Sequence, residues 1–170
     1  MGPHDFAMPL VACRCGDYGG LWVPYLYTST DASLACYREC QGWPAVLADV
    51  ELREEGGQVR ARVLRQGRVI IAASGEVGGD PITELDLPPI ILYKEIPSID
   101  GVGTDVASFV TSTSKFSNVA LLAGSGTLSF PEPGDDPVAE LVPQQITSVL
   151  YGSMDDHYPE TIRLLDPSDQ

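Results

Sequence analysis

The spacing of glycine and proline is the feature of this sequence that most restricts its fold. Seventeen glycines and fourteen prolines are spread along 170 residues and divide them into many short apolar stretches. Stretches of this length, rich in β-branched and aromatic residues and bounded by turn formers, are typical of β-strands. The sequence therefore predicts a mainly β domain, with too little helix for a dinucleotide-binding fold.

One hairpin shows the pattern most clearly. Val59, Ala61 and Val63 alternate with Arg60 and Arg62, which predicts a strand with one dry face and one wet face. Turn formers on either side join this strand to two neighbours. The expected strands are Leu21–Tyr27, Val46–Arg53, Gln58–Leu64, Arg68–Ala73, Pro88–Ile96, Asp105–Thr113, Asn118–Phe130 and Gln144–Tyr151.

One helix is expected, over Asp31–Glu39, with Thr30 or Asp31 as its N-cap. Within the last long strands, Gly124–Ser125–Gly126 predicts a β-bulge. Residues 165–170 are expected to form a frayed tail. Long strands with little helix in a small domain favour a barrel or cone, and the lack of any linker predicts a single domain over residues 1–170.

Charge and hydropathy exclude several classes of partner. Ten Lys and Arg residues against 24 Asp and Glu residues give a net charge of −14, which opposes binding to nucleic acid or to anionic lipid. No apolar run approaches the roughly 20 residues that cross a bilayer, and the first residues do not resemble a secretory signal. We therefore expect a cytoplasmic protein that binds neither nucleic acid nor membrane.

The cysteines and histidines do not form a metal-binding pattern. Zinc sites use pairs of ligands at short, regular spacings, whereas here the pairs are Cys-x-Cys and Cys-x3-Cys and the histidines lie near the two ends. His157 follows two aspartates, and we expect a solvated loop there. We expect free thiols, no metal and no cofactor. The residues concerned are Cys13, Cys15, Cys36, Cys40, His4 and His157.

The densest run of distinctive residues surrounds the pair Arg38–Glu39. Several large rings occur near this pair, and they indicate either an apolar pocket with a few polar groups or a filled barrel core. Composition alone favours the core. Imine chemistry is restricted to Lys94, in an apolar strand, and Lys115, in a polar turn where we expect it to be exposed. The rings belong to Trp22, Tyr25, Tyr27, Tyr37 and Trp43.

The segment from Tyr37 to Ala48 resembles a motif of the acetoacetate decarboxylase superfamily. That motif has Gly-Arg-Glu, a small residue, an aromatic residue, Pro and two lysines, and Arg38, Glu39 and Trp43 match it. Pro24–Tyr27 upstream and Leu92–Gly101 downstream follow in the family's order. The similarity extends from about Phe6 to about Tyr151 and implies a double-layered β-barrel or cone with one short helix and a central apolar pocket.

The departures from this family change the expected chemistry. The two positions at which family decarboxylases carry lysines, the first of which forms a Schiff base, are Ala45 and Val46 here. Neither side chain can form an imine. Lys94 matches a family lysine that is not the imine-forming one. The resemblance further leads us to expect that the family's N-terminal portion, which brings Arg and Glu residues into the decarboxylase site, is missing. A homodimer is one arrangement that would cover apolar surface exposed in this way.

We therefore expect a Schiff-base-independent cyclase, or a related lyase, that acts on a hydrophobic polyketide-type natural-product intermediate. An apolar pocket can fold such a molecule into a reactive conformation. One alternative is a decarboxylase or hydratase of a small β-keto or pyruvate-like acid, and another is a non-catalytic module that binds a small molecule. The expected catalytic residues are Glu39, Arg38 and Tyr25, and the expected substrate-binding residues are Trp22, Tyr27, Trp43, Ala45, Val46 and Lys94.

Overall fold

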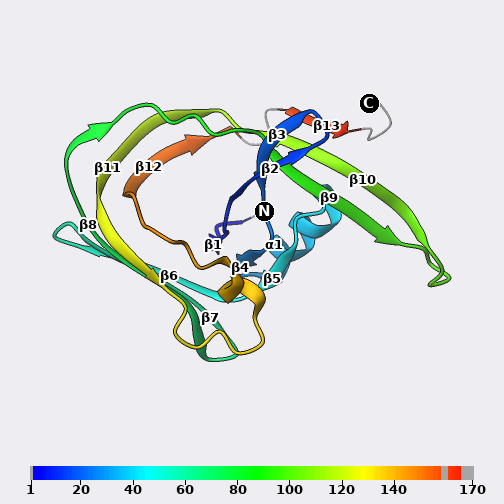
Figure 1. Cartoon of the computed structure of the whole chain (residues 1–170), viewed down its shortest axis with the longest axis horizontal. Coiled ribbons are helices and arrows are strands. Elements are labelled where there is room, and N and C mark those ends of the chain that lie inside the picture. The colour runs from blue at the N-terminus through cyan, green and yellow to red at the C-terminus, as the bar shows by residue number, and fades with distance from the viewer. Residues whose placement is uncertain (1, 158–160, 166–170) are drawn as a thin grey trace.

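The computed structural model describes residues 2–157 and 161–165, and its strands form three curled sheets (Figure 1). The first sheet has the order β1 (Phe6–Ala7), β4 (Leu26–Thr28), β5 (Ala45–Leu47). The second has the order β13 (Thr161–Leu165), β10 (Thr104–Thr113), β9 (Ile90–Pro97), β3 (Tyr18–Trp22), β2 (Val11–Cys15). The third has the order β12 (Val149–Asp156), β11 (Phe116–Ser129), β8 (Arg68–Ile82), β7 (Gln58–Arg65), β6 (Asp49–Glu55).

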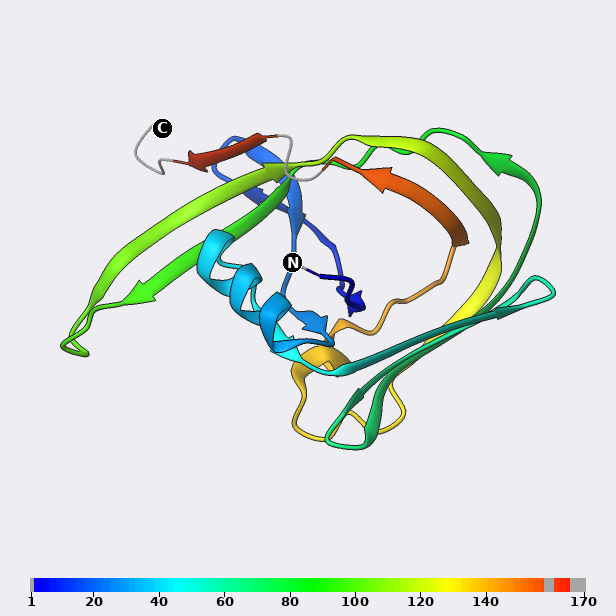
Figure 2. The ribbon, with the colours of Figure 1, turned by 180° about the vertical axis from the view of Figure 1, so that it is seen from behind.

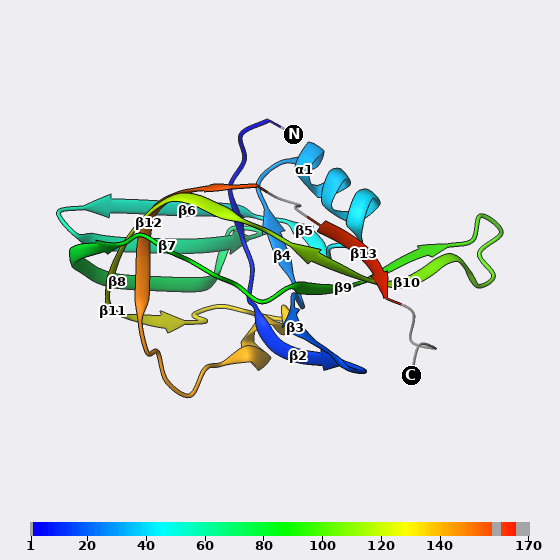
Figure 3. The ribbon, with the colours of Figure 1, turned by 90° about the horizontal axis from the view of Figure 1, so that it is seen from above.

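The third sheet forms a curved wall around the N-terminal strands. Strands β8 and β11 arch over one side of the molecule, and β1, β4 and β5 lie inside the curve, next to the helix (Figures 1 and 2). Strands β9 and β10 extend away from this wall as a long hairpin (Figure 3). The sheets together form a half-barrel. The mainly β fold with one short α-helix, expected from the sequence, is confirmed.

Glycines allow β8 and β11 to bend and to approach each other closely. The register shifts between Leu121 and Ala123, which pair with Ile82 and Gly78. The bulge expected at Gly124–Gly126 is therefore wrong, because pairing is regular through those residues and the irregularity lies outside them. A Cβ atom at Gly124 would collide with the backbone oxygen of Glu76. This glycine serves close strand packing and not a bulge.

The helix follows the expected boundaries with one change of type. Helix α1 (Asp31–Cys36) begins after Thr30, whose Oγ1 accepts a hydrogen bond from the Ser33 amide at 3.2 Å, so Thr30 is the N-cap. One π-helical turn (Tyr37–Gln41) continues it and ends at Gly42, which has φ 76° and ψ 27°. A left-handed residue ends a helix most easily when it is glycine. No helix in the described part of the chain has the length and apolar character needed to cross a membrane.

The core is divided into two clusters, one on each side of the central strands. The first packs Leu26 of β4 and Ala45 of β5 against Ile90, Leu92 and Val110 of the second sheet. The second cluster contains Tyr27 of β4 and residues of the third sheet. Successive residues of a strand point to opposite faces, so β4 and β5 bury both of their faces and separate the two clusters.

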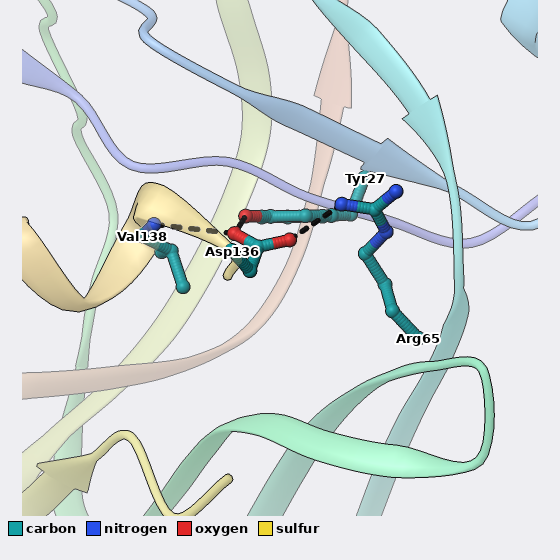
Figure 4. A network of polar contacts seen from close by, with 4 residues as sticks. All are labelled: Tyr27, Arg65, Asp136 and Val138. Carbon is teal, nitrogen blue, oxygen red and sulfur yellow. Dashed lines mark hydrogen bonds and ion pairs between the residues drawn. The ribbon is translucent and has the colours of Figure 1, made fainter. Parts of the chain in front are cut away.

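A polar network closes the second cluster (Figure 4). The Tyr27 hydroxyl donates to Asp136 Oδ1 at 2.8 Å, and Arg65 Nη1 donates to Asp136 Oδ2 at 2.6 Å. Asp136 also accepts from the amide of Val138, at the start of the 3-10 helix Pro137–Leu141. Burial raises the pKa of the Asp136 carboxyl, but the hydrogen bonds from Arg65, Tyr27 and Val138 outweigh it and the pKa is lowered. Burial and the adjacent Asp136 raise the pKa of the Tyr27 hydroxyl.

Several expected strand boundaries differ in the structure. The segment expected as Leu21–Tyr27 belongs to two strands, β3 and β4, and the segment expected as Gln144–Tyr151 forms a strand only from Val149. Strands β1, β2 and β13 and the 3-10 helix were not expected. Leu165, placed in a frayed tail, is the last residue of β13 and pairs with Phe109. The rest of that expected tail lies outside the described residues.

We expect Asp136→Asn to destabilise the fold by about 1.5–3 kcal/mol at neutral pH, because it removes a charged hydrogen-bond acceptor that is 6% exposed. The folded-state pKa of Asp136 lies below its ordinary value of 3.8. The stabilisation is therefore complete above that value and is lost as the pH falls through the lowered folded-state pKa. Urea unfolding of both proteins between pH 7 and pH 2 measures this. A stability difference that stays constant with pH would contradict it.

Candidate functional site

An apolar pocket of about 160 Å³ lies where the three sheets meet. Leu26 represents the first sheet in its wall, Ile90 and Ser112 the second, and Met154 the third. Phe6 of β1 also belongs to the first sheet, and Phe116 of β11 and Asp156 of β12 to the third. The remaining wall comes from segments between strands and from the helix end. The full set of lining residues is Phe6, Met8, Leu26, Tyr37, Trp43, Leu87, Pro88, Ile90, Ser112, Ser114, Phe116, Met154 and Asp156.

Strand pairing places the deep residues of the pocket. Ser112 of β10 is the register partner of Ile90 of β9, and both lie in the wall. Ser112 is 1% exposed, and its Oγ has no hydrogen-bond partner in the structure. Val110, two residues earlier on the same face of β10, belongs to the first core cluster. Ser112 is thus a buried hydroxyl in an otherwise apolar part of the wall.

An aromatic group forms the side of the pocket next to the helix. The rings of Tyr37 and Trp43 are 5.8 Å apart in an edge-on arrangement, and Phe6 lies 6.4 Å from Tyr37. His4 Nε2 and the Tyr37 hydroxyl form a hydrogen bond of 3.0 Å. Edge-to-face ring pairs of this kind favour a fixed geometry. The aromatic wall therefore holds a defined shape, while Phe6, 47% exposed, lies toward the solvent.

Lys94 joins the helix end to the second sheet. Its Nζ donates to the backbone oxygens of Glu39 and Cys40 at 2.9 and 3.0 Å, where a helix carries partial negative charge. Gly42 lies directly against this lysine: a Cβ atom there would be 2.6 Å from Lys94 Cα. Lys94 was expected to bind substrate, but its ammonium group caps the helix and it is not in the pocket wall.

The two positions that carry lysines in family decarboxylases lie beside the pocket but face the two core clusters. Ala45 is fully buried in the first cluster, together with Trp43, and is the register partner of Leu26. Val46 packs against the second cluster. Both were expected to line the pocket, and neither does. The alternation of side chains along β5 sends the two residues to opposite faces.

The other expected site residues are spread over the molecule. Trp43 lies in the pocket wall, but Trp22 is 46% exposed on β3. Tyr27, together with Tyr25, belongs to the second cluster. Strands β4 and β5 separate Trp43 from Tyr25 and Tyr27, so these rings do not line one space. Roles in substrate binding for Trp22 and Tyr27 stay predictions.

Arg38 and Glu39 are both exposed in the π-helical turn. Arg38 Nη1 donates to the Ala45 carbonyl at 3.5 Å. Neither residue lies in the pocket wall. Catalytic roles for Arg38, Glu39 and Tyr25 stay predictions.

Sequence reasoning missed most of the wall. Met8 lies in a segment that resembles the family, Ala7–Pro9, but was not expected in a site. Met154 lies in a segment with no motif, and Ser112 is one hydroxyl residue among several in β10. Asp156 was expected in a solvated loop. It is exposed, at the end of β12, but also belongs to the pocket wall and is the carboxylate in it. These residues are brought together by pairing between distant strands, which no local pattern indicates.

The cysteines are free thiols in the structure, and three of them are partly buried while Cys40 is exposed. The sulfur atoms of Cys36 and Cys40 are 3.8 Å apart. Among the described residues, no group of three or more His, Cys, Asp or Glu side chains has a metal-binding arrangement. His157 is exposed and bonded to Ser117 at 2.7 Å, and Lys115 is exposed as expected.

We expect Gly42→Ala to destabilise the protein more than Gly67→Ala. The φ angles are 76° and 77°, so both substitutions cost roughly 1–2 kcal/mol for a left-handed alanine. A Cβ at Gly67 has open space, whereas one at Gly42 would displace Lys94 from the helix end. Urea unfolding of the two variants measures the difference. Equal losses would show that the contact with Lys94 does not stabilise the fold.

Solved structures of known proteins share this fold. A crystal structure of acetoacetate decarboxylase from Legionella pneumophila matches 97% of this chain and 68% of its own, with a TM-score of 0.82 and 20% identity. The enduracididine biosynthesis enzyme MppR, in complex with the condensation product of pyruvate and imidazole 4-carboxaldehyde, matches 95% of this chain and 66% of its own (TM-score 0.77, 19% identity). An acetoacetate decarboxylase-like enzyme from Sphingomonas wittichii matches 91% and 65% (TM-score 0.66, 14% identity).

At these identities the structures establish the fold, and this chain spans about two thirds of the length of each. No curated protein matches the sequence. The model of the acetoacetate decarboxylase family, however, matches residues 1–164, which is nearly the whole chain. The protein belongs to the acetoacetate decarboxylase family.

Proposed function

We propose that this family member binds a hydrophobic small molecule in the pocket lined by Trp43. The protein then catalyses ring closure within that molecule without forming an imine. The observation that carries the proposal is the pocket wall itself, which is apolar apart from two serines, the Tyr37 hydroxyl, the Trp43 ring N–H and Asp156, and which contains no lysine. Covalent catalysis through an imine needs an amine at the substrate. Here Ala45 and Val46 stand at the family's two lysine positions.

The size of the pocket indicates how much of a substrate it encloses. A cavity of roughly 150 Å³ takes up a benzene ring, and this pocket measures about 160 Å³. It therefore encloses the reacting ring of a polyketide-type intermediate, and the rest of the molecule extends past the exposed residues Phe6 and Met154. Bringing the reacting atoms into contact accounts for a large part of the barrier to ring closure, and a pocket that holds them together lowers that barrier.

Asp156 supplies the proton handling in this proposal. In an intramolecular addition, one carbon–carbon σ bond forms and one π bond is consumed. The carboxylate takes a proton from the donor carbon and returns it to the acceptor, so substrate and product are isomers. Proton transfer of this type contributes about 10²–10⁴ in rate. Asp156 lies in the wall, whereas Glu39, the acid or base expected from the sequence, is exposed outside it.

A non-catalytic binding module is the second candidate. The exposed positions of Arg38 and Glu39 favour it, because the polar groups matched to the family lie away from the pocket. A decarboxylase or hydratase of a small acid has less support. Its substrate carboxylate would need a cationic partner, and the described pocket wall contains neither Lys nor Arg.

Ligand binding is tested by filling the pocket. We expect Ser114→Trp to abolish binding of a ring-sized probe such as toluene, because the indole occupies the space at a partly exposed wall position. Ser129→Trp is the matched control, since Ser129 is exposed on β11 outside the wall. Calorimetry measures both. Undiminished binding to Ser114→Trp would place the site elsewhere.

Chemistry without an imine is tested by borohydride reduction in the presence of acetoacetate or acetone. We expect no increase in protein mass, because Lys94 is bonded to the helix end and the pocket wall has no lysine. Intact-mass and peptide mass spectrometry measure this. A reduced adduct on Lys94 or Lys115 would contradict the proposal.

The reaction itself is tested by incubation with linear polyene and polyketide analogues. We expect a cyclised product of unchanged mass, formed about 10²-fold more slowly by Asp156→Asn and at the original rate by Glu39→Gln. Chromatography with mass detection follows both. Binding of the analogues without turnover in the unsubstituted protein would support the binding module instead.

A further inference from the structure

The buried hydroxyl of Ser112 is the least explained polar group in the pocket. Its residue is 1% exposed, and the Oγ atom has no hydrogen-bond partner in the structure. Leaving a buried hydroxyl unsatisfied costs about 1–3 kcal/mol, and an alanine at the same place would avoid that cost. A group of this kind in a folded protein calls for a specific explanation.

The position of Ser112 in the wall suggests what satisfies it. Its register partner Ile90 lines the same pocket, as do Leu26 and Trp43 of the first core cluster, so the hydroxyl lies in a mainly apolar surrounding. Thr28 and Ser33 provide a contrast: they are equally buried, and their hydroxyls bond to each other. Among the residues whose burial the structure describes, the hydroxyls of Thr28 and Ser33 are thus paired, and that of Ser112 is unpaired in the wall of a ligand-sized pocket.

The chemistry of the wall restricts the ligand. A serine hydroxyl donates one hydrogen bond and can accept others. The acceptor for this hydroxyl is either an anion or a neutral oxygen. An anion would lose much of its hydration in an apolar pocket, and the carboxylate of Asp156 at the rim repels it. The partner of Ser112 is therefore an uncharged oxygen on an otherwise apolar, ring-sized body.

We infer that Ser112 is a specificity-determining residue: it donates a hydrogen bond to a neutral carbonyl oxygen on an apolar ligand in this pocket. The inference rests on the proposed function, and it narrows the ligand from hydrophobic molecules in general to compact, uncharged ketones, aldehydes or esters. A hydrogen bond to a carbonyl conjugated with a reacting double bond also draws electrons from that bond, which assists the ring closure proposed above.

Two probes of similar shape separate the contribution of the oxygen from that of the apolar body. Acetophenone carries a carbonyl where cumene carries a methyl-bearing carbon. The ε-methyl groups of Met8 and Met154, both in the wall, report on binding by NMR after methyl labelling. We expect both probes to shift these signals in the unsubstituted protein, because both rings fit the pocket.

The variant Ser112→Ala then tests the hydroxyl. We expect it to weaken acetophenone binding by about two- to tenfold, the usual range for one neutral hydrogen bond, and to leave cumene binding unchanged or tighter. Ser108→Ala, on the same strand and the same face but outside the wall, is the matched control and should change neither affinity. The ligand-free Ser112→Ala protein should melt about 2–6 °C higher, because it no longer buries an unsatisfied hydroxyl.

The outcomes distinguish this inference from the proposed function. If neither probe shifts the Met8 and Met154 signals, the pocket does not bind such molecules and both proposals fail. If both probes bind and Ser112→Ala changes neither their ratio nor the melting temperature, the pocket binds by shape alone and the role of Ser112 is overturned. An unchanged ratio with a lower melting temperature would mean that an internal partner satisfies the hydroxyl, which also overturns it.

Discussion

The contact between the helix end and strand β9 holds the pocket together. The ammonium group of Lys94 binds two carbonyl oxygens of the last helical turn, and Gly42 permits this approach because it has no side chain. Tyr37 belongs to that turn and Trp43 follows it. The same contact therefore fixes the aromatic wall against Ile90 and Ser112 of the second sheet. Without it, the helix end and β9 would lose this directional contact, and apolar packing has little directional preference.

The pocket combines this fixed wall with a mainly apolar lining. A lysine that forms an imine needs surroundings that lower the pKa of its ammonium group, so that the neutral amine is available to react. In this chain the corresponding position, Ala45, is packed into the first core cluster. The polar groups in the wall are hydroxyls, the Trp43 ring N–H and one carboxylate at the rim. Such a wall favours neutral ligands.

The second core cluster has a mainly structural part in this arrangement. Tyr27 was expected to touch substrate, but its hydroxyl binds Asp136, which Arg65 and the Val138 amide also hold. The network ties the loop after β11 to the first and third sheets (Figure 4). It keeps β4 in place, and β4 carries Leu26 on its opposite face into the pocket.

Local sequence patterns determined the secondary structure where chain neighbours decide it. The alternation at Val59–Val63 predicted β7, the turn formers around it predicted its hairpins, and Thr30 predicted the start of the helix. The short strand β1 was missed, because its partner β4 lies far away in the chain. Strand β2 was missed as well, although it forms a hairpin with the next strand, β3. The family motif singled out Trp43, which lies in the pocket wall.

The tertiary structure alone decided which residues share a pocket. The motif placed Arg38, Glu39, Trp43 and Ala45 within eight positions. In the structure, Arg38 and Glu39 are exposed, Trp43 lies in the pocket wall and Ala45 lies in the first core cluster. Met8, Ser112 and Met154 are far apart in the chain and meet because three sheets curl toward one point. Proximity in sequence fixes backbone geometry over a few residues, whereas a pocket depends on the curvature and register of whole sheets.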